Sequence, residues 1–316
     1  MLLAACSTPT RLSPVPEHST FDAVIEDIPM ARFYLREGDQ YFLDIVTLAF
    51  DRFLEHHDAQ DLELWHDASL VLSSGRDGGA FAAGLLNGWS DRGTRPVFSM
   101  VTGVSTGALV APFAFAGSEY DALLRALFTH SNPEDIHRPR GFVSALFGDA
   151  YSDSAPLAAI IDKRVDAALL ETIAGEYQKG RLLFIGTTNL DARIAVIWNM
   201  GAIAASGHPD APALFRKIML ASASIPGLFP PVMIDVTSRQ ENHQEMHVDG
   251  GTTGQLFAYP AWVTPKSFDS RFEALLNANL MSLYIIRNSK YRPKWSGVEL
   301  HTPSIALGAI ETLTHT

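Results

Sequence analysis

An uncharged run from Pro96 to Gly117, PVFSMVTGVSTGALVAPFAFAG, constrains this 316-residue chain more than any other stretch. With about 20 predominantly apolar residues, it is long enough for a membrane-spanning helix. Glycines and small hydroxyl residues concentrate in its middle, and a break there divides the run into a buried strand, a tight turn and a buried helix. We therefore expect a strand-turn-helix unit rather than a membrane span.

The turn of this unit reads Gly103-Val104-Ser105-Thr106-Gly107, a G-x-S-x-G pattern. A nucleophilic serine needs a sharp strand-to-helix turn, and flanking glycines let the strand and the helix pass close together beneath it. The hydroxyl would lie at a helix N-terminus, where backbone N–H groups and the helix dipole favour a developing negative charge. The pattern alone fits both a catalytic serine and a plain helix N-cap.

Strand and helix patterns alternate along the rest of the chain. A helical pattern runs through residues 21–64, where Phe42, Ile45, Val46, Phe50 and Phe53 recur at spacings of three and four. Strands are expected at 69–74, 95–103, 181–188, 193–200, 232–236, 245–251 and 281–288, and further helices at 80–89 and 211–224. This alternation predicts an α/β fold, three-layer α/β/α with a largely parallel central sheet.

Composition limits the class of protein. Apolar residues make up 47% of the chain and charged residues 19%, as in a globular protein. The net charge of −11 comes without a block of Lys and Arg, so the sequence argues against binding to nucleic acid. No domain linker is evident, and we expect one domain over residues 21–316. The apolar pattern at 303–316 resembles a helix without a stop signal, so the natural chain is expected to continue.

The N-terminus contains the one cysteine, Cys6, in the sequence LLAAC. This stretch resembles a bacterial lipobox, but a secretory signal has a basic segment and roughly 7–15 apolar residues before its cleavage site. Either the natural start lies upstream, or the match is fortuitous. Residues 7–20 are rich in Pro, Ser and Thr, so we expect residues 1–20 to form a tether. The protein would then be lipid-anchored in the bacterial cell envelope, and otherwise cytoplasmic or secreted.

Two more glycine-containing turns flank this unit in the chain. The first, SSGRDGGAF at 73–81, allows several backbone N–H groups to point toward one oxyanion, although it is also consistent with a phosphate loop or a tight connection. The lysine of a Walker-type loop is absent. The second, HVDGGTTG at 247–254, places Asp249 at the end of an apolar strand, where Asp-Gly is also a common plain turn.

These three pieces, with ASASIPGLFPP at 221–231 before the last, resemble the patatin-like phospholipase family over Leu70–Gly254. The resemblance implies an α/β fold and a Ser-Asp dyad that cleaves phospholipids or related lipid esters through an acyl-enzyme. It assigns Ser105 as the nucleophile and Asp249 as the base. The oxyanion hole would be built from the glycine loop, Gly75, Arg76, Asp77 and Gly78.

The glycine loop departs from the family pattern, which reads Ser-Gly-Gly-Gly-x-Lys/Arg-Gly. Here Ser74 and Arg76 occupy two of the glycine positions, and Gly78 occupies the basic one. The basic residue is therefore displaced, and Arg76 either turns toward the oxyanion hole or pairs with Asp77 at the surface.

Other interpretations stay open. A Ser-His-Asp triad is compatible with the chain order if His301 supplies the imidazole and Asp235 or Asp249 the carboxylate. A non-catalytic lipoprotein that uses the fold for binding is a second alternative. His247 would share a strand face with Asp249 and either tune it or lie solvated at the strand end.

The sequence predicts no metal or other cofactor. The pairs His56-His57 and Asp58-Asp61 lack a coherent ligand spacing. The expected partners are a lipid or lipid-ester substrate and a membrane surface.

Overall fold

A computed structural model gives the architecture. It describes residues 11–36, 39–57, 67–75, 78–129, 138–139, 152–268, 270, 273, 281–289, 295, 297–300, 304–305, 308–309 and 312.

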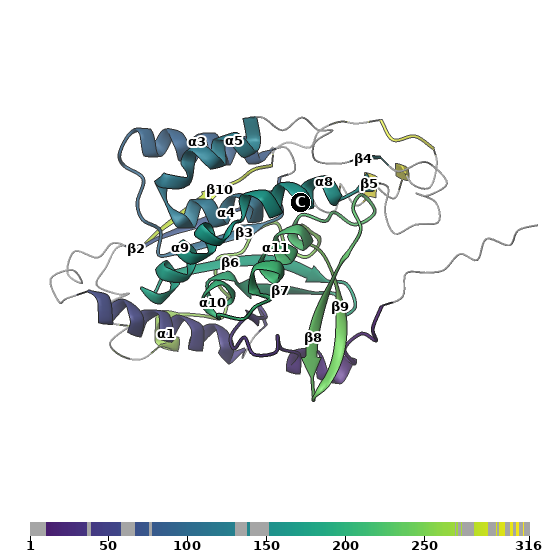
Figure 1. Ribbon diagram of the computed structural model, residues 1–316, viewed down its shortest axis with the longest axis horizontal. Coiled ribbons are helices and arrows are strands. Elements are labelled where there is room, and N and C mark those ends of the chain that lie inside the picture. The colour runs from purple at the N-terminus through teal and green to yellow at the C-terminus, as the bar shows by residue number, and fades with distance from the viewer. Residues whose placement is uncertain are drawn as a thin grey trace, which may run out of the picture.

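A central sheet of eight strands organises the described part of the chain (Figure 1). Six strands follow one another in the order β1 (Arg32–Phe33), β7 (Ile194–Asn199), β6 (Leu182–Asn189), β3 (Met100–Val104), β2 (Asp67–Leu72) and β10 (Met281–Ile286). The hairpin of β8 (Val232–Ser238) and β9 (Glu241–Asp249) joins the sheet through β6. A separate pair consists of β4 (Arg138–Pro139) and β5 (Ser152–Asp153).

The sheet is mixed. Strands β10, β2, β3 and β6 run parallel to one another, whereas β1, β7, β9 and β8 pair antiparallel with their neighbours. Every residue of β2 and of β6 is buried, which is typical of parallel strands covered on both faces. The predicted parallel pairing is thus found in four adjacent strands, among them β2, which precedes the glycine loop, and β3, which precedes the G-x-S-x-G turn.

Helices cover both faces of this sheet (Figure 1). One face packs against α3 (Gly79–Asp91), α4 (Thr106–Ala116), α5 (Asp121–Thr129), α8 (Ala155–Arg164), α9 (Ala167–Gln178), α10 (Met200–Ala205) and α11 (Ala211–Ser222). The other packs against α1 (Gln40–His56). Alternation along β6 separates the two cores, because Leu183 and Ile185 face the larger helical layer while Phe184 faces α1. The predicted α/β/α class is confirmed.

The uncharged run divides as expected. Residues 100–104 form β3, Ser105 occupies the turn, and α4 follows directly. The strand begins five residues later than predicted, and α4 is buried along most of its length. Among the described residues, no helix combines the length and the apolar character needed to cross a bilayer.

Residues 11–20, the described part of the predicted tether over 1–20, contact the domain at both ends. Arg11 forms a paired hydrogen bond with Asp191 at 2.7 and 3.1 Å. Thr20 is buried, and its carbonyl accepts a hydrogen bond from the Tyr34 hydroxyl at 2.9 Å. A Pro- and Ser-rich composition did not reveal these tertiary contacts.

Several predictions lie outside the described residues. Residues 1–10, with Cys6, are among them, as are Arg76, Asp77 and His301. The helix expected at 303–316 also lies largely outside.

Candidate active site

Two strands meet end to end on one edge of β6 to form the site. Strand β3 runs parallel to β6 and pairs Val104 with Gly186, while β9 runs antiparallel and pairs Asp249 with Thr187, the next residue along. Because β7 occupies the opposite edge of β6, β3 and β9 share one edge and point toward each other. The residue that follows β3, Ser105, therefore arrives beside the last residue of β9.

The turn after β3 is as tight as the G-x-S-x-G pattern predicts. Ser105 has φ 55° and ψ −120°, an uncommon backbone conformation for a residue with a side chain. A Cβ atom on Gly103 would lie 2.6 Å from the Gly107 carbonyl oxygen, and one on Gly107 would lie 2.2 Å from the Leu72 carbonyl oxygen. Only glycine fits at these two positions, so β3, α4 and β2 approach at backbone distance beneath the serine.

The structure brings Ser105 and Asp249 together. The Ser105 hydroxyl donates a hydrogen bond to Asp249 Oδ2 at 2.5 Å, and the residues are 5% and 4% exposed. The second carboxylate oxygen, Oδ1, accepts from the Gly251 N–H at 2.7 Å. This orients the carboxylate toward the hydroxyl, which can pass its proton to Oδ2 without an intervening group.

The glycine loop between β2 and α3 lies next to this pair. A Cβ atom on Gly251 would lie 3.4 Å from the Ser74 Cβ, so the start of the loop adjoins the turn after Asp249. A Cβ atom on Gly79 would lie 2.6 Å from the Thr106 Cγ2, so its end adjoins the residue after Ser105. Both ends of the loop therefore flank the Ser105–Asp249 pair.

Within this loop, Gly75 and Gly78 pack against Asn288, which follows β10. A Cβ atom on Gly75 would lie 2.4 Å from the Asn288 carbonyl carbon. The Gly78 N–H donates to the Gly75 carbonyl at 2.8 Å, so it is occupied within the loop. The role of Gly78 in the oxyanion hole stays a prediction. Sequence reasoning did not identify Asn288, because nothing in a strand-end asparagine indicates that a distant loop rests on it.

His247 is completely buried, so its interpretation as a solvated strand-end residue is wrong. Its Nδ1 lies 2.9 Å from the Thr187 hydroxyl, and its Nε2 lies 3.0 Å from a Glu245 carboxylate oxygen. Burial lowers the pKa of His247 below its usual 6.5, although hydrogen bonding and attraction to Glu245 oppose the shift. A neutral ring fits these contacts if Nε2–H donates to Glu245 and Nδ1 accepts from Thr187.

Glu245 in turn is paired with Arg32 of β1, at 2.5 and 3.1 Å. Burial alone would raise the pKa of Glu245, but the Arg32 charge and the hydrogen bonds from His247 and Arg32 outweigh it and lower the pKa to about 2. The network ties β1, β9 and β6 together behind the dyad. The two ring nitrogens of His247 contact Thr187 and Glu245, and Thr187 is the residue of β6 that pairs with Asp249.

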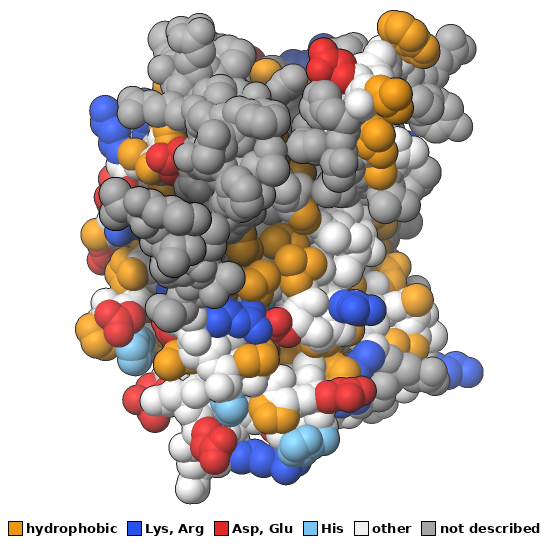
Figure 2. Space-filling model, turned by 90° about the vertical axis from the view of Figure 1, so that its right-hand side faces the viewer, with side chains coloured by type: hydrophobic (Ala, Val, Ile, Leu, Met, Phe, Trp, Pro, Cys, Tyr) orange, Lys and Arg blue, Asp and Glu red, His pale blue; other side chains and the backbone are white. Residues whose placement is uncertain are grey.

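Figure 2 shows the side of the molecule toward which β6 points in Figure 1. Hydrophobic side chains gather near the middle of this side, and acidic, basic and histidine side chains lie below them.

Among the described residues, no group of histidine, cysteine and acidic side chains has the arrangement of a metal site.

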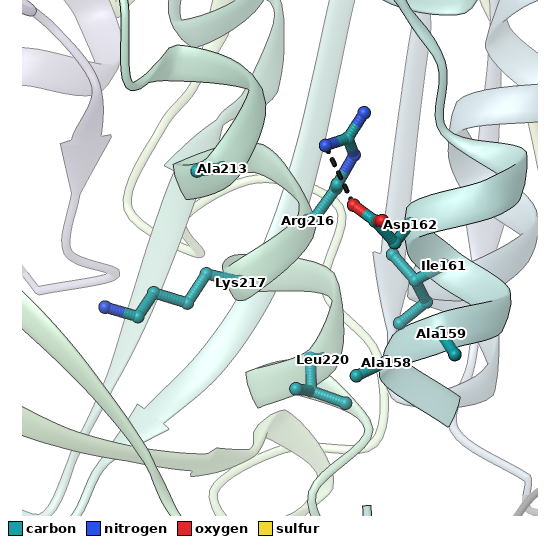
Figure 3. A pocket seen from close by; sticks show the side chains of 8 residues that line it. All are labelled: Ala158, Ala159, Ile161, Asp162, Ala213, Arg216, Lys217 and Leu220. Atoms are coloured by element: carbon teal, nitrogen blue, oxygen red, sulfur yellow. Dashed lines mark ion pairs between the residues drawn. The ribbon is translucent and has the colours of Figure 1, made fainter. Parts of the chain in front are cut away.

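Two hollows border α11, and neither is lined by the dyad. One, of about 430 Å³, lies between α8 and α11, where Arg216 pairs with Asp162 at 2.9 Å (Figure 3). The other, of about 670 Å³, lies between α11 and the β8–β9 hairpin. Both apolar and charged side chains line these hollows, and we assign no ligand to them.

In this site a serine on a strand-to-helix turn is hydrogen-bonded to a carboxylate at the end of a strand. This is the arrangement of α/β proteins in which a serine attacks carbonyl groups. A family model described as patatin-like phospholipase matches residues 70–262. Since this span exceeds half of the chain, the protein belongs to the patatin-like phospholipase family, which consists of carboxylic ester hydrolases.

A comparison with curated protein sequences gave no significant match. Among solved structures, the crystal structure of VipD from Legionella pneumophila overlaps at a TM-score of 0.39 with 12% identity. The overlap covers 70% of this chain and 49% of that one, so the chain spans about half the length of that protein. At this score the overlap carries no argument, and the fold class rests on the topology described above.

Proposed function

We propose that the protein is a serine lipid acyl hydrolase that cleaves carboxylic ester bonds of phospholipids or related lipids with a Ser105–Asp249 dyad. The observation that carries this proposal is the 2.5 Å hydrogen bond from the Ser105 hydroxyl to Asp249 Oδ2, formed at the end of two converging strands. The family membership supports it independently.

In the first half-reaction, Ser105 Oγ attacks the ester carbonyl carbon and its proton passes to Asp249 Oδ2. Backbone N–H groups of the glycine loop at Gly75 stabilise the tetrahedral oxyanion. The bond to the leaving alkoxide then breaks, and Asp249 returns the proton to that oxygen. Water attacks the acyl-enzyme in the same manner, giving up a proton to Asp249 that restores the Ser105 hydroxyl as the fatty acid leaves.

The direct contact favours a dyad over a triad. In a Ser-His-Asp triad an imidazole lies between hydroxyl and carboxylate, which separates them by more than one hydrogen bond. At 2.5 Å, Ser105 and Asp249 leave no room for a ring between their bonded oxygens. We therefore expect His301→Asn to retain activity, whereas a loss comparable with that of Ser105→Ala would establish the triad.

Exposed apolar side chains near the dyad support a lipid substrate. Leu256 and Tyr259, in the segment after Asp249, are 39% and 47% exposed. This segment lies against the site, because the Phe257 carbonyl accepts from Thr102 of β3 at 2.6 Å. An acyl chain that enters the site would contact such side chains, and the contact would remove apolar surface from water.

The test is a panel of phospholipid, triacylglycerol and short-chain esters, assayed with the parent and Ser105→Ala, together with labelling by a fluorophosphonate. We expect hydrolysis and labelling in the parent and neither in Ser105→Ala. Ser90→Ala is a matched control, because this half-buried hydroxyl donates within α3 to Leu86. A folded parent that neither hydrolyses nor labels would replace this proposal with a binding function.

We also propose that Cys6 carries a lipid anchor that holds the enzyme at the cell envelope. The supporting observation is the lipobox-like LLAAC sequence. Expression in bacteria with a clickable palmitate analogue should label the parent, and Cys6→Ser should abolish the label. Labelling that is absent from the parent, or retained in the variant, would overturn the anchor.

A further inference from the structure

The end of α11 contacts the backbones of both proposed dyad residues. Ser222 is the last residue of α11, and Ser224 follows two positions later. Both are completely buried. Their contacts differ, since Ser222 uses its side chain toward Ser105 and Ser224 uses its main chain toward Asp249.

The Ser222 hydroxyl bridges β3 and β6 where their direct pairing stops. It accepts a hydrogen bond from the Ser105 N–H at 2.9 Å and donates one to the Gly186 carbonyl at 2.7 Å. The last paired residues of the two strands are Val104 and Gly186. A single oxygen thus joins two buried main-chain groups, each of which is costly to leave without a partner.

This bridge acts at the point of backbone strain. Ser105 adopts a positive φ of 55°, and such conformations persist only where the surroundings hold them. Gly103 and Gly107 permit the turn sterically, but they do not hold the Ser105 N–H. The Ser222 hydroxyl holds this N–H through its hydrogen bond. It therefore sets the direction in which the Ser105 side chain leaves the turn.

Ser224 holds the other member of the dyad. Its carbonyl accepts a hydrogen bond from the Asp249 N–H at 2.8 Å. Its hydroxyl donates back into the helix, to the Leu220 carbonyl at 2.8 Å. The side chain of Ser224 is therefore not the part that reaches the site, and its removal leaves the contact to Asp249 in place.

We propose that Ser222 is a positioning residue for the nucleophile, and that residues 222–224 act as one bracket that sets the separation of Ser105 and Asp249. This inference rests on the proposed function. It assigns a role to the Ala-Ser-Ala-Ser segment at 221–224, which ends the helix expected from the sequence at 211–224.

The test compares Ser222→Ala with Ser90→Ala, which removes the same atom from a serine of α3 whose hydroxyl donates to the Leu86 carbonyl. Because misplacement of a nucleophile by about 1 Å costs up to about 100-fold in rate, we expect Ser222→Ala to lower kcat by about 10- to 100-fold. The KM should change little, and the fluorophosphonate labelling rate should fall in parallel. Ser90→Ala should stay close to the parent. Equal losses in both variants would overturn the proposal.

A second measurement does not depend on turnover. Amide hydrogen exchange of Ser105 should be faster in Ser222→Ala than in the parent or in Ser90→Ala, because only Ser222→Ala removes its acceptor. Unchanged exchange at Ser105 would overturn the bracket whatever the activity. If the parent and Ser105→Ala are equally inactive while exchange at Ser105 rises as expected, the proposed function fails and the structural role of Ser222 stands.

Discussion

The backbone at Gly78 lies directly against Asn288, such that a Cβ atom on Gly78 would be 1.7 Å from the Asn288 carbonyl oxygen. Asn288 is itself tied to the start of the loop, since its N–H donates to the Ser73 hydroxyl at 2.9 Å and its side-chain amide donates to the Ser73 carbonyl at 2.8 Å. The glycine loop therefore rests on the end of β10, a strand outside the span that matches the family model.

Gly78→Ala should impair catalysis, because the obstacle is a main-chain atom and the loop must move to admit a methyl group. A displaced loop would move the N–H groups at Gly75 that we propose hold the oxyanion. Since loss of one oxyanion donor typically costs about 10²–10³-fold in kcat, we expect a decrease of about that size in ester hydrolysis. Gly84→Ala is the matched control, since a Cβ atom there meets nothing within 4 Å. In the interior of α3 it should keep full activity and add up to about 1 kcal/mol of stability.

Asp249→Asn should abolish hydrolysis while preserving the fold. The amide has the size of the carboxylate but cannot take the Ser105 proton, so we expect a decrease in kcat of about 10³-fold or more. Asp235→Asn is the control, because that carboxylate belongs to the neighbouring strand β8 and its side chain is 66% exposed. Substantial hydrolysis by Asp249→Asn would remove the base from the mechanism.

The buried Arg32–Glu245 pair should show strong coupling in a double-mutant cycle. Arg32 and Glu245 are 6% and 1% exposed, so removal of one partner leaves an uncompensated buried charge. Arg32→Met alone should destabilise the protein by about 3–5 kcal/mol, whereas Arg32→Met combined with Glu245→Met should cost clearly less. Urea denaturation measures both, and additive effects would contradict the expected coupling.

Stability should fall on acidification partly through His247. Its folded-state pKa is lowered by burial, so as the pH falls below about 6.5 the unfolded chain binds a proton that the folded chain does not. Glu245 acts in the same direction at lower pH, because its contribution is present above its usual 4.5 and is lost as the pH approaches about 2. Urea midpoints between about pH 7.5 and 5.5 should therefore decline less in His247→Gln than in the parent. Parallel declines would show that His247 does not contribute.

Much of the fold was predictable because apolar periodicity and glycine spacing are local signals. The strand-turn-helix unit around Ser105 and the strand that ends at Asp249 both follow from such patterns. The reason for Gly103 and Gly107 was also predictable, because a side chain at either position would collide with the backbone that packs beneath the turn.

The supports of the site were not predictable in the same way. Ser222 reaches Ser105 across 117 residues of sequence, and Asn288 reaches Ser73 across 215. His247 is a polar residue in a strand, and only the tertiary contacts to Thr187 and Glu245 explain why it is buried. A polar side chain whose partner lies on a distant strand leaves no periodic signal.

The junction of β3 and β9 on one edge of β6 has a consequence for how the chain tolerates change in length. The spacing between hydroxyl and carboxylate depends on two successive residues of β6, Gly186 and Thr187, and on the contacts of residues 222–224, and not on the number of residues between Ser105 and Asp249. Surface loops in that stretch are free to grow or shrink. One residue added to β6 between Gly186 and Thr187 would separate the two groups by about 3.3 Å. Both residues would keep their local structure, but the hydroxyl could no longer reach the carboxylate.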